Sequence, residues 1–524
     1  MRMNGTYITG FGKYFPGEPV SNEQMEGRLG KIGGKPSRAR HRVLAQNGIK
    51  TRYYALDDAQ ETTVSNSEMA AGAVRDLLQN TECPVDAVGF LAAATTQGDL
   101  PVPGFASMVH GELELPAVEI ATLHGVCCSG LMALKAAALQ VSSGEHDAAV
   151  ACASEIPSRL FKAERYAGQD VLRESSLPFD TEFLRWMLSD GAGAALVQNR
   201  ANPSGLSLRI DWIQIRSHAD RYPLCMYAGA NKDSGGAIGK GWLDYPSFEA
   251  AARDGALNLK QDIRLLDDVV KLGVNGLFEL IESGKVDPDR LDWIVCHYSS
   301  EFFKSRIFEL LELGGVRLPA ERWFSNLTSK GNVGSASTFV LLEELFNEGA
   351  LSPGQELLLM IPESGRSTMG YAKLTVVGET EKKRLPAAPV DEPVSVPVLK
   401  LRDDPILQSL VRQLTQVWVE FEGDLQRVPI LERLYRGHWT RADYQALLLN
   451  LRQQVVEGSR WIARAASSID SAHSELRSLF VRHAKDEHRD FTMLERDYVS
   501  VGGDVKGIRS GEKNLGSEAL NAWM

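Results

Sequence analysis

Two stretches with the same pattern decide the fold of this chain. Residues 125–144 read GVCCSGLMALKAAALQVSSG, and residues 331–349 read GNVGSASTFVLLEELFNEG. Each opens on glycine and small residues and continues as a long apolar segment, which is typical of a buried helix. An apolar strand follows each stretch (AAVACASE, ELLLMIPESG), and another precedes it (VGFLAAATT, DWIVCHYSS). This order predicts two α/β units in one chain.

The two units recur at a nearly constant distance along the chain. Ala94 and His297 are 203 positions apart, and Cys128 and Asn332 are 204 apart. Self-similarity at this period indicates a duplicated α/β unit. A pseudo-two-fold relation would bring the two helix starts together, with His297 beside them. Strand ends and helix starts are where open α/β folds gather their functional residues.

Length and composition restrict the class of protein. The chain has 524 residues, 44% of them hydrophobic and 24% charged, with a net charge of −11. This size predicts more than one domain, and the absence of a basic excess argues against nucleic acid. No segment approaches the roughly 20 apolar residues that span a bilayer, and the first residues lack a signal-peptide pattern. We therefore expect a cytoplasmic protein with reduced cysteines.

Composition also divides the chain. Residues 379–404 are rich in proline and charge without sustained periodicity, which is typical of a linker. Strands and helices alternate in residues 1–378, whereas residues 405–524 contain only amphipathic helical patterns. The sequence therefore predicts an α/β domain, a linker and a helical domain with these boundaries.

Cys128 is the candidate nucleophile, and Cys127 is left undecided. At a helix start, free N–H groups and the helix dipole favour a thiolate, and the N–H of Cys128 itself can bind an oxyanion. His297 and Asn332 offer two donors to a thioester carbonyl. These donors would stabilise the enolate that forms when a malonyl-type thioester loses carbon dioxide. Attack of that carbanion on acyl-Cys128 is a Claisen condensation in two half-reactions.

The segments GVCCSGLMAL, SDGAGAALV, VCHYSSEFF and KGNVGSAS resemble the motifs of β-ketoacyl-ACP synthase III, in the thiolase superfamily. The resemblance covers about residues 5 to 378. It implies a duplicated αβαβα thiolase-like fold, a homodimer, and catalysis by Cys128, His297 and Asn332 without a cofactor. Coenzyme A or the phosphopantetheine of an acyl or malonyl carrier protein would carry the substrates. The family's oxyanion loop falls near Gly365.

The sequence also departs from that family. A tryptophan and an arginine expected before NGI are absent, with Gln46 near the position of the arginine, and extra residues are expected at about 205–275. Arg38, Arg40 and Arg42 form a basic cluster that could bind a phosphopantetheine donor or an acidic carrier protein. The alternative is a solvated basic surface. These departures put acetyl-CoA, the family's usual primer, in doubt.

The helical region is similar to haem-oxygenase-like proteins, which include di-iron oxidases, through the segment HAKDEHRDF. Glu457, His483 and Glu487 are its candidate metal ligands, since carboxylates and imidazoles on facing helices hold di-iron sites. However, Arg464 stands where a histidine is expected, and the chain ends as a further helix begins. We therefore expect no complete iron site within these residues, and charged side chains on a solvated helix face.

Four functions remain open from the sequence. The first is a ketosynthase, which the presence of Asn332 favours because an enolate needs that donor. The second is an acyltransferase that passes the Cys128 acyl group to an alcohol or amine. A non-catalytic thiolase-fold subunit is the third, and the intact Cys, His and Asn set argues against it. In the fourth, the helical region acts as an oxidative partner on the product.

Overall fold

A computed structural model describes residues 5–113, 115–174, 177–233, 235–378, 405–426, 428–435 and 438–523. Its contacts divide the chain into two compact units, Met1–Gln416 and Val417–Met524. The predicted linker, residues 379–404, lies outside the described residues, and the domain boundaries predicted from the sequence stay a prediction. Among the described helices, none has the length and apolar character needed to cross a membrane.

Unit 1 is built on one ten-stranded sheet with the order β12-β11-β13-β14-β8-β1-β7-β6-β4-β5. The strands are β1 (Tyr7–Tyr14), β4 (Phe90–Thr95), β5 (Glu119–His124), β6 (Ala148–Glu155), β7 (Gly191–Gln198), β8 (Ser207–Ser217), β11 (Trp293–Cys296), β12 (Trp323–Phe324), β13 (Glu356–Glu363) and β14 (Thr368–Val377). β1 and β8 pair antiparallel at the centre. On each side of this seam two antiparallel pairings are followed by two parallel ones. The repeated topology confirms the duplication predicted from the sequence.

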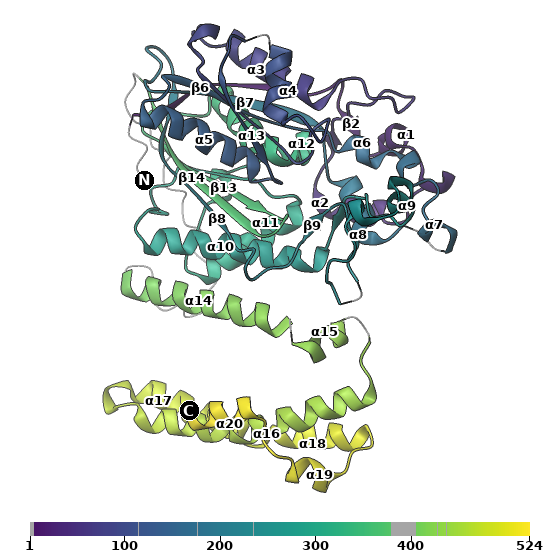
Figure 1. Cartoon of the computed structure of the whole chain (residues 1–524). Helices are drawn as coiled ribbons and strands as arrows, with labels where there is room; N and C mark the ends of the chain where they lie inside the picture. The colour runs from purple at the N-terminus through teal and green to yellow at the C-terminus, as the bar shows by residue number, and fades with distance from the viewer. Residues whose placement is uncertain are drawn as a thin grey trace. The chain divides into compact units, whose positions relative to one another are not determined.

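Helices complete five layers around the two halves of the sheet (Figure 1). They are α3 (Asn66–Gln79) and α4 (Phe105–Leu113) outside the first half, α5 (Ser129–Ser143) and α13 (Ser337–Asn347) in the middle, and α10 (Leu266–Glu282) with α11 (Glu301–Leu313) outside the second. The middle helices share one apolar core with both halves. β4 and β6 are buried along their whole length, which explains their continuous apolar sequence. The predicted thiolase-like αβαβα fold is confirmed.

The two middle helices start against each other at a single close contact. A Cβ atom on Gly130 would lie 2.1 Å from the backbone oxygen of Ser335, which is far inside van der Waals contact. Only glycine at the start of α5 therefore allows the turn of residues 334–336 (η8) to approach so closely. This contact holds the helix starts of the two halves together, in addition to the β1–β8 pairing that joins the halves in the sheet.

Two connecting segments surround the carboxyl ends of the first-half strands. Residues 15–65 contain β2 (Val20–Ser21), α1 (Met25–Leu29), η1 (Ile32–Gly34), α2 (Arg40–Asn47) and β3 (Thr51–Arg52). Residues 156–190 contain α6 (Ser158–Phe161), η3 (Ala163–Tyr166), α7 (Val171–Glu174), α8 (Phe179–Glu182) and η4 (Phe183–Trp186). Several of their apolar side chains form a separate buried cluster.

A third segment, residues 218–265, joins β8 to α10 and is called the lobe below. It contains β9 (Met226–Tyr227), η5 (Trp242–Asp244), α9 (Phe248–Arg253), β10 (Lys260–Gln261) and η6 (Ile263–Leu265). The buried ammonium of Lys260 donates to the carbonyl oxygens of Ala230, Ala256 and Asn258 at 2.9, 3.2 and 3.1 Å. One cation thus fixes three turns of a segment with little regular structure. The lobe lies within the range 205–275, where the family resemblance predicts extra residues.

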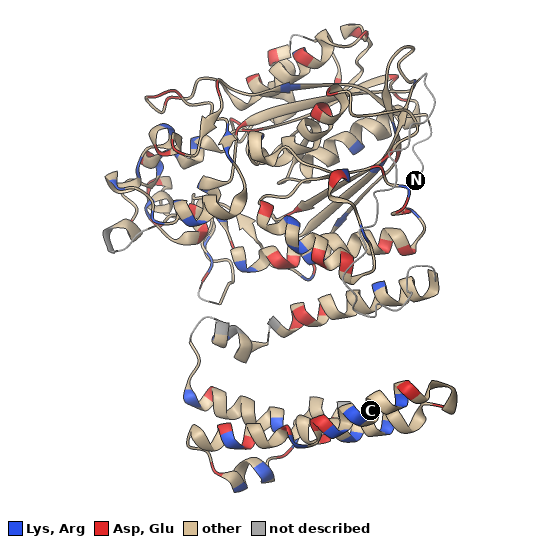
Figure 2. Ribbon diagram, turned by 180° about the vertical axis from the view of Figure 1, so that it is seen from behind, with Lys and Arg blue, Asp and Glu red and all other residues tan. Residues whose placement is uncertain are grey.

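The regular elements among the described residues of unit 2 are all helices. Its elements are the end of α14 (Pro405–Gln426), α15 (Pro429–Tyr435), α16 (Arg441–Ser468), η10 (Ser471–His473), α17 (Ser474–Asp486), η11 (Glu487–Arg489), α18 (Phe491–Ser500), α19 (Val505–Ser510) and α20 (Leu515–Trp523). Thr440 and Asp443 form a capping box at the start of α16. Figure 2 shows acidic and basic residues mixed along these helices. The resemblance to haem-oxygenase-like proteins stays a prediction.

Replacing Gly130 by alanine tests the contact between the two halves. We expect Gly130→Ala to lower the free energy of unfolding by about 1–3 kcal/mol, because the new methyl group overpacks the Ser335 carbonyl. Urea unfolding followed by circular dichroism measures the change. Gly111→Ala in α4 is the matched control, since no atom lies within 4 Å of its Cβ position. Equal stability of the two variants would contradict the role of the contact.

Candidate active site

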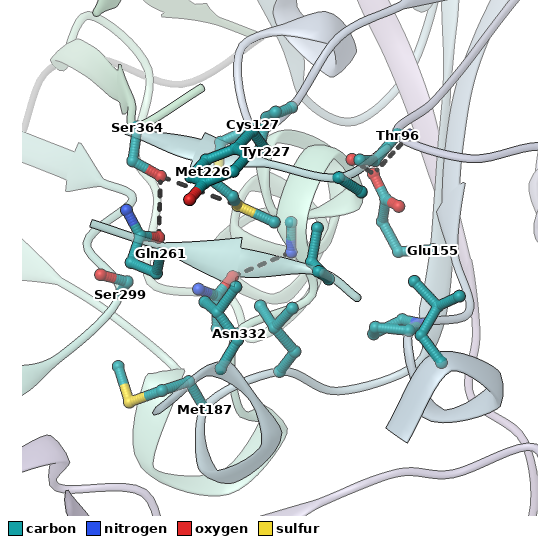
Figure 3. A pocket seen from close by; sticks show the side chains of 18 of the residues that line it. Thr96, Cys127, Glu155, Met187, Met226, Tyr227, Gln261, Ser299, Asn332 and Ser364 are labelled. Atoms are coloured by element: carbon teal, nitrogen blue, oxygen red, sulfur yellow. Dashed lines mark hydrogen bonds between the residues drawn. The ribbon is translucent and has the colours of Figure 1, made fainter. Parts of the chain in front are cut away.

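A cavity of about 840 Å³ lies in unit 1 where strands of both halves end. Its polar lining includes Thr96, Cys127, Glu155, His297 and Asn332. Figure 3 shows Cys127, Glu155 and Asn332 around the same space. Cys127 follows β5 and Glu155 ends β6, both in the first half of the fold, whereas His297 and Asn332 belong to the second half. The duplication therefore brings residues of both halves to one site, where Cys127 rather than the predicted Cys128 lines the cavity.

The two adjacent cysteines take different positions. Cys127 lines the cavity, whereas Cys128 is fully buried, and a Cβ on Gly370 of β14 would lie 2.7 Å from its sulfur. Cys128 is the N-cap of α5, as predicted. Its N–H donates to Oε2 of Glu363 at 3.1 Å, so this group is not free to bind an oxyanion. Consecutive residues in a helical turn point about 100° apart, which is why only one thiol faces the cavity.

His297 and Asn332 are held by their backbones and face the cavity with polar side chains. The N–H of His297 donates to Met360 of β13 at 3.0 Å. Burial lowers the pKa of His297 to about 4, so its imidazole is neutral at physiological pH. Oδ1 of Asn332 accepts the N–H of Gly334 at 2.9 Å, which orients the amide and leaves its NH₂ group as the donor (Figure 3).

The resting thiol of Cys127 is protonated. Burial raises its pKa well above the usual value, and the negative charges of Glu363 and Glu155 raise it further. A hydrogen bond from its own backbone N–H acts in the opposite direction but is weaker. The thiolate expected at this helix start is therefore not the resting state, because removal from water outweighs the effect of the helix dipole.

Glu155 is a cavity residue that the sequence reasoning missed. Its Oε1 accepts the N–H and hydroxyl of Thr96 at 3.0 and 2.7 Å, and the N–H and hydroxyl of Ser335. Burial raises the pKa of Glu155 to about 7. The carboxylate thus ties the end of β4 to the turn that follows Asn332. An acidic residue at the end of an otherwise apolar strand was the signal available in the sequence.

The loop at Gly365 lies beside the Cys127 turn. A Cβ on Gly365 would meet Val126 at 2.9 Å, and the Gly365 carbonyl accepts the N–H of Cys225 at 3.0 Å. The neighbouring Ser364 lines the cavity, although Gly365 itself does not. This placement is compatible with the predicted oxyanion role of the loop.

The predicted basic cluster lies away from the cavity lining. Arg40 pairs with a buried glutamate at 3.2 Å, Arg42 lies over a phenylalanine ring, and Arg38 is exposed. Two other arginines line the cavity: Arg159, which pairs with an aspartate at 2.9 Å, and the exposed Arg165. They are better placed than the predicted cluster to meet a substrate in this cavity.

The candidate metal ligands of the helical region do not form a metal site in the described part of the chain, where no three acidic, histidine or cysteine side chains are grouped. The Glu457 carboxylate is bound by Lys513 at 3.1 Å and Arg460 at 2.8 Å. His483 is exposed on α17, and Glu487 begins η11. Both oxygens of the carboxylate that a metal would need are therefore paired with basic side chains.

Comparisons with known proteins concern the α/β part of the chain. The family model "Beta-ketoacyl synthase, N-terminal domain" matches residues 104–202, and "3-Oxoacyl-[acyl-carrier-protein (ACP)] synthase III C terminal" matches residues 281–370. Beta-ketoacyl-[acyl-carrier-protein] synthase III 1 of Lactiplantibacillus plantarum is 23% identical over 348 residues, which is 65% of this chain and 91% of that protein.

Solved structures match the same part. AbyA1, a tetronic acid condensing enzyme, has a TM-score of 0.57 at 19% identity and covers 71% of this chain and 99% of its own. A single-residue variant of Xanthomonas campestris OleA has a TM-score of 0.56 at 20% identity and covers 72% of this chain and 99% of its own. Thermus thermophilus β-ketoacyl-ACP synthase III has a TM-score of 0.53 at 21% identity and covers 70% of this chain and 98% of its own. This chain has the fold of the β-ketoacyl synthase III enzymes. At these identities the likeness establishes the fold, and the reaction has to be argued from the site.

The charge of Glu363 provides a test of the site's electrostatics. We expect Glu363→Gln to lower the pKa of Cys127, because of the two nearby carboxylates Glu363 raises that pKa more. The glutamine keeps an oxygen that can accept the Cys128 N–H. Alkylation of Cys127 by iodoacetamide should then accelerate and reach its plateau at lower pH, as measured by peptide mass spectrometry. Glu348→Gln, an exposed glutamate, is the control. An unchanged pH profile for Glu363→Gln would contradict this electrostatic account.

Proposed function

We propose that this chain is a ketosynthase that carries an acyl group on Cys127 and condenses it with a malonyl-type thioester. The observation that supports this most is the meeting of a thiol, an imidazole and an amide in one cavity from the two halves of the fold. The β-ketoacyl synthase III fold and the condensing enzymes among its structural relatives support the same reaction class.

Cys127 replaces Cys128 as the proposed nucleophile for two reasons. Its side chain lines the cavity, whereas that of Cys128 packs against β14. In addition, Cys127 and Asn332 each lie three residues before the groups in contact at the centre, Gly130 and Ser335. The internal symmetry of the fold thus pairs Asn332 with Cys127.

Acyl transfer to Cys127 is the proposed first step. The neutral imidazole of His297 can accept the thiol proton, and the sulfur attacks the carbonyl carbon of the incoming thioester. The C–S bond to the carrier then breaks, and the carrier leaves as its free thiol with a proton. We assign the tetrahedral oxyanion to the N–H of Cys127 and to the loop of Ser364 and Gly365, of which Ser364 lines the cavity.

Condensation follows on a second thioester. The bond between Cα and the carboxylate of the malonyl group breaks, carbon dioxide leaves, and the electron pair becomes an enolate. The side chains of His297 and Asn332 donate to the enolate oxygen. The carbanion attacks acyl-Cys127, the C–S bond breaks, and the Cys127 thiolate takes up a proton from solvent. No oxidant or metal enters this balance.

Carriers and assembly are part of the same proposal. Coenzyme A or the phosphopantetheine arm of a carrier protein would present both thioesters, and Arg165 stands at the cavity with an exposed guanidinium. β5 is the last strand of the sheet, so one of its edges is open to a second copy. Leu100 and Val102, exposed before α4, add apolar surface near it. These features support the homodimer implied by the family resemblance.

Two cysteine variants separate the proposed nucleophile from its neighbour. We expect Cys127→Ala to abolish the acyl adduct formed with a panel of acyl-CoA thioesters, while Cys128→Ala retains it. Intact-protein mass spectrometry measures the adduct, and peptide mapping locates it. Circular dichroism checks that both variants fold, since Cys128 belongs to the core. An adduct that survives Cys127→Ala and disappears in Cys128→Ala would restore Cys128 as nucleophile.

Carbon dioxide release distinguishes condensation from simple acyl transfer. We expect Asn332→Ala to lower decarboxylation of malonyl-CoA or malonyl carrier protein by about 10²–10³-fold, because one donor to the enolate is lost. Acylation of Cys127 should change little, which the mass assay checks in the same samples. Full activity of Asn332→Ala without carbon dioxide release, on an alcohol or amine acceptor, would favour the acyltransferase instead.

A further inference from the structure

The lobe forms one wall of the active-site cavity. Its apolar contributions include Met226, Leu257 and Leu259, and α10 extends the same wall with Val270. The segment of residues 156–190 faces them with leucine, methionine and phenylalanine side chains. The cavity therefore has a predominantly apolar lining, and the lobe supplies one side of it.

Polar groups line the same cavity. Thr96, Glu155, His297 and Asn332 lie where strands end or immediately after them. A mostly apolar lining with a few polar groups is the arrangement expected for a ligand with a polar reacting group and a large apolar remainder. A two-carbon acyl group on Cys127 would leave most of the apolar wall in contact with water.

The lobe is also bonded directly to the loop near Cys127. The N–H of Met226 donates to the Ser364 carbonyl at 2.8 Å, and the Ser364 hydroxyl contacts Oε1 of Gln261 at 3.4 Å (Figure 3). The N–H of Cys225 donates to Gly365. The backbone that holds the apolar wall therefore also holds the loop assigned to the oxyanion. The same lobe residues therefore hold both the wall proposed to bind the acyl chain and the loop proposed to bind the oxyanion.

We propose that the lobe is the acyl-chain site of this enzyme and that it selects thioesters with a long apolar acyl group over acetyl thioesters. This inference rests on the proposed function, because it concerns the group carried on Cys127. The departure of the sequence from the family's acetyl-CoA pattern agrees with it. Leu257 and Val270, on the lobe and on α10, are the specificity-determining residues that it names.

Rates of acylation with saturated acyl-CoA thioesters test the proposal. Each methylene that enters the apolar cavity is expected to favour acylation by up to about fourfold, so decanoyl-CoA should exceed acetyl-CoA by about 100-fold or more in second-order rate constant. Intact-protein mass spectrometry with acetyl-, hexanoyl- and decanoyl-CoA measures the series. A flat series, with Cys127 acylated equally by all three, overturns the proposal.

Two variants that narrow the cavity test whether its apolar wall determines the preference for acyl-chain length. Leu257→Trp and Val270→Phe should lower the ratio of the decanoyl-CoA to the acetyl-CoA rate constant at least tenfold. Ile238→Trp is the matched control: it lies on the lobe with 43% exposure, comparable to the 37% of Leu257, but does not line the cavity. Its preference should equal that of the wild type.

The outcomes separate this inference from the proposed function. If no thioester of any length acylates Cys127 in the wild-type protein, the proposed function fails. If acylation occurs but Leu257→Trp and Val270→Phe slow all chain lengths equally, while Ile238→Trp does not, the lobe supports the site without selecting the chain, and the inference is overturned.

Discussion

The rest of the structure depends on the contact between the backbone of Gly130 and the carbonyl of Ser335. It is the place where the two copies of the α/β unit meet at their helix starts, and a single methyl group would not fit there. Cys127 and Asn332 lie at equal distances along the chain from this contact. The separation of the proposed nucleophile from the proposed enolate donor is therefore set by backbone packing rather than by mobile side chains.

Burial limits the charge of the site that forms around this contact. It keeps the Cys127 thiol protonated and the imidazole of His297 uncharged, and it raises the pKa of Glu155 to about 7. The carboxylates of Glu155 and Glu363 are the negative groups beside the thiol. Further charge develops when a thioester arrives and a proton moves. Donors that are already oriented, such as the Asn332 amide, then act in a cavity with little water to reorganise.

The sequence was sufficient for the fold because the deciding elements are local. β4, β6 and α5 are continuous apolar runs bounded by glycine or polar residues, and their repetition predicted the duplicated α/β unit, whereas the αβαβα layers were implied by the family resemblance. The sequence could not show which of Cys127 and Cys128 faces the cavity, because two adjacent residues differ only in the direction in which their side chains leave the turn. Glu155 and the lobe were also missed as parts of the site, because their roles arise from contacts between residues such as Glu155 and Ser335, which are 180 positions apart.

The protonated state of Cys127 has a consequence for the survival of the enzyme. Peroxides and other oxidants react with thiolates far faster than with thiols, and over-oxidised cysteine is not recovered. Cys127 is a residue with 7% exposure, so its protonated thiol presents little to such reagents. If it is the nucleophile, as proposed, the burial that keeps it protonated without substrate also protects it from oxidation.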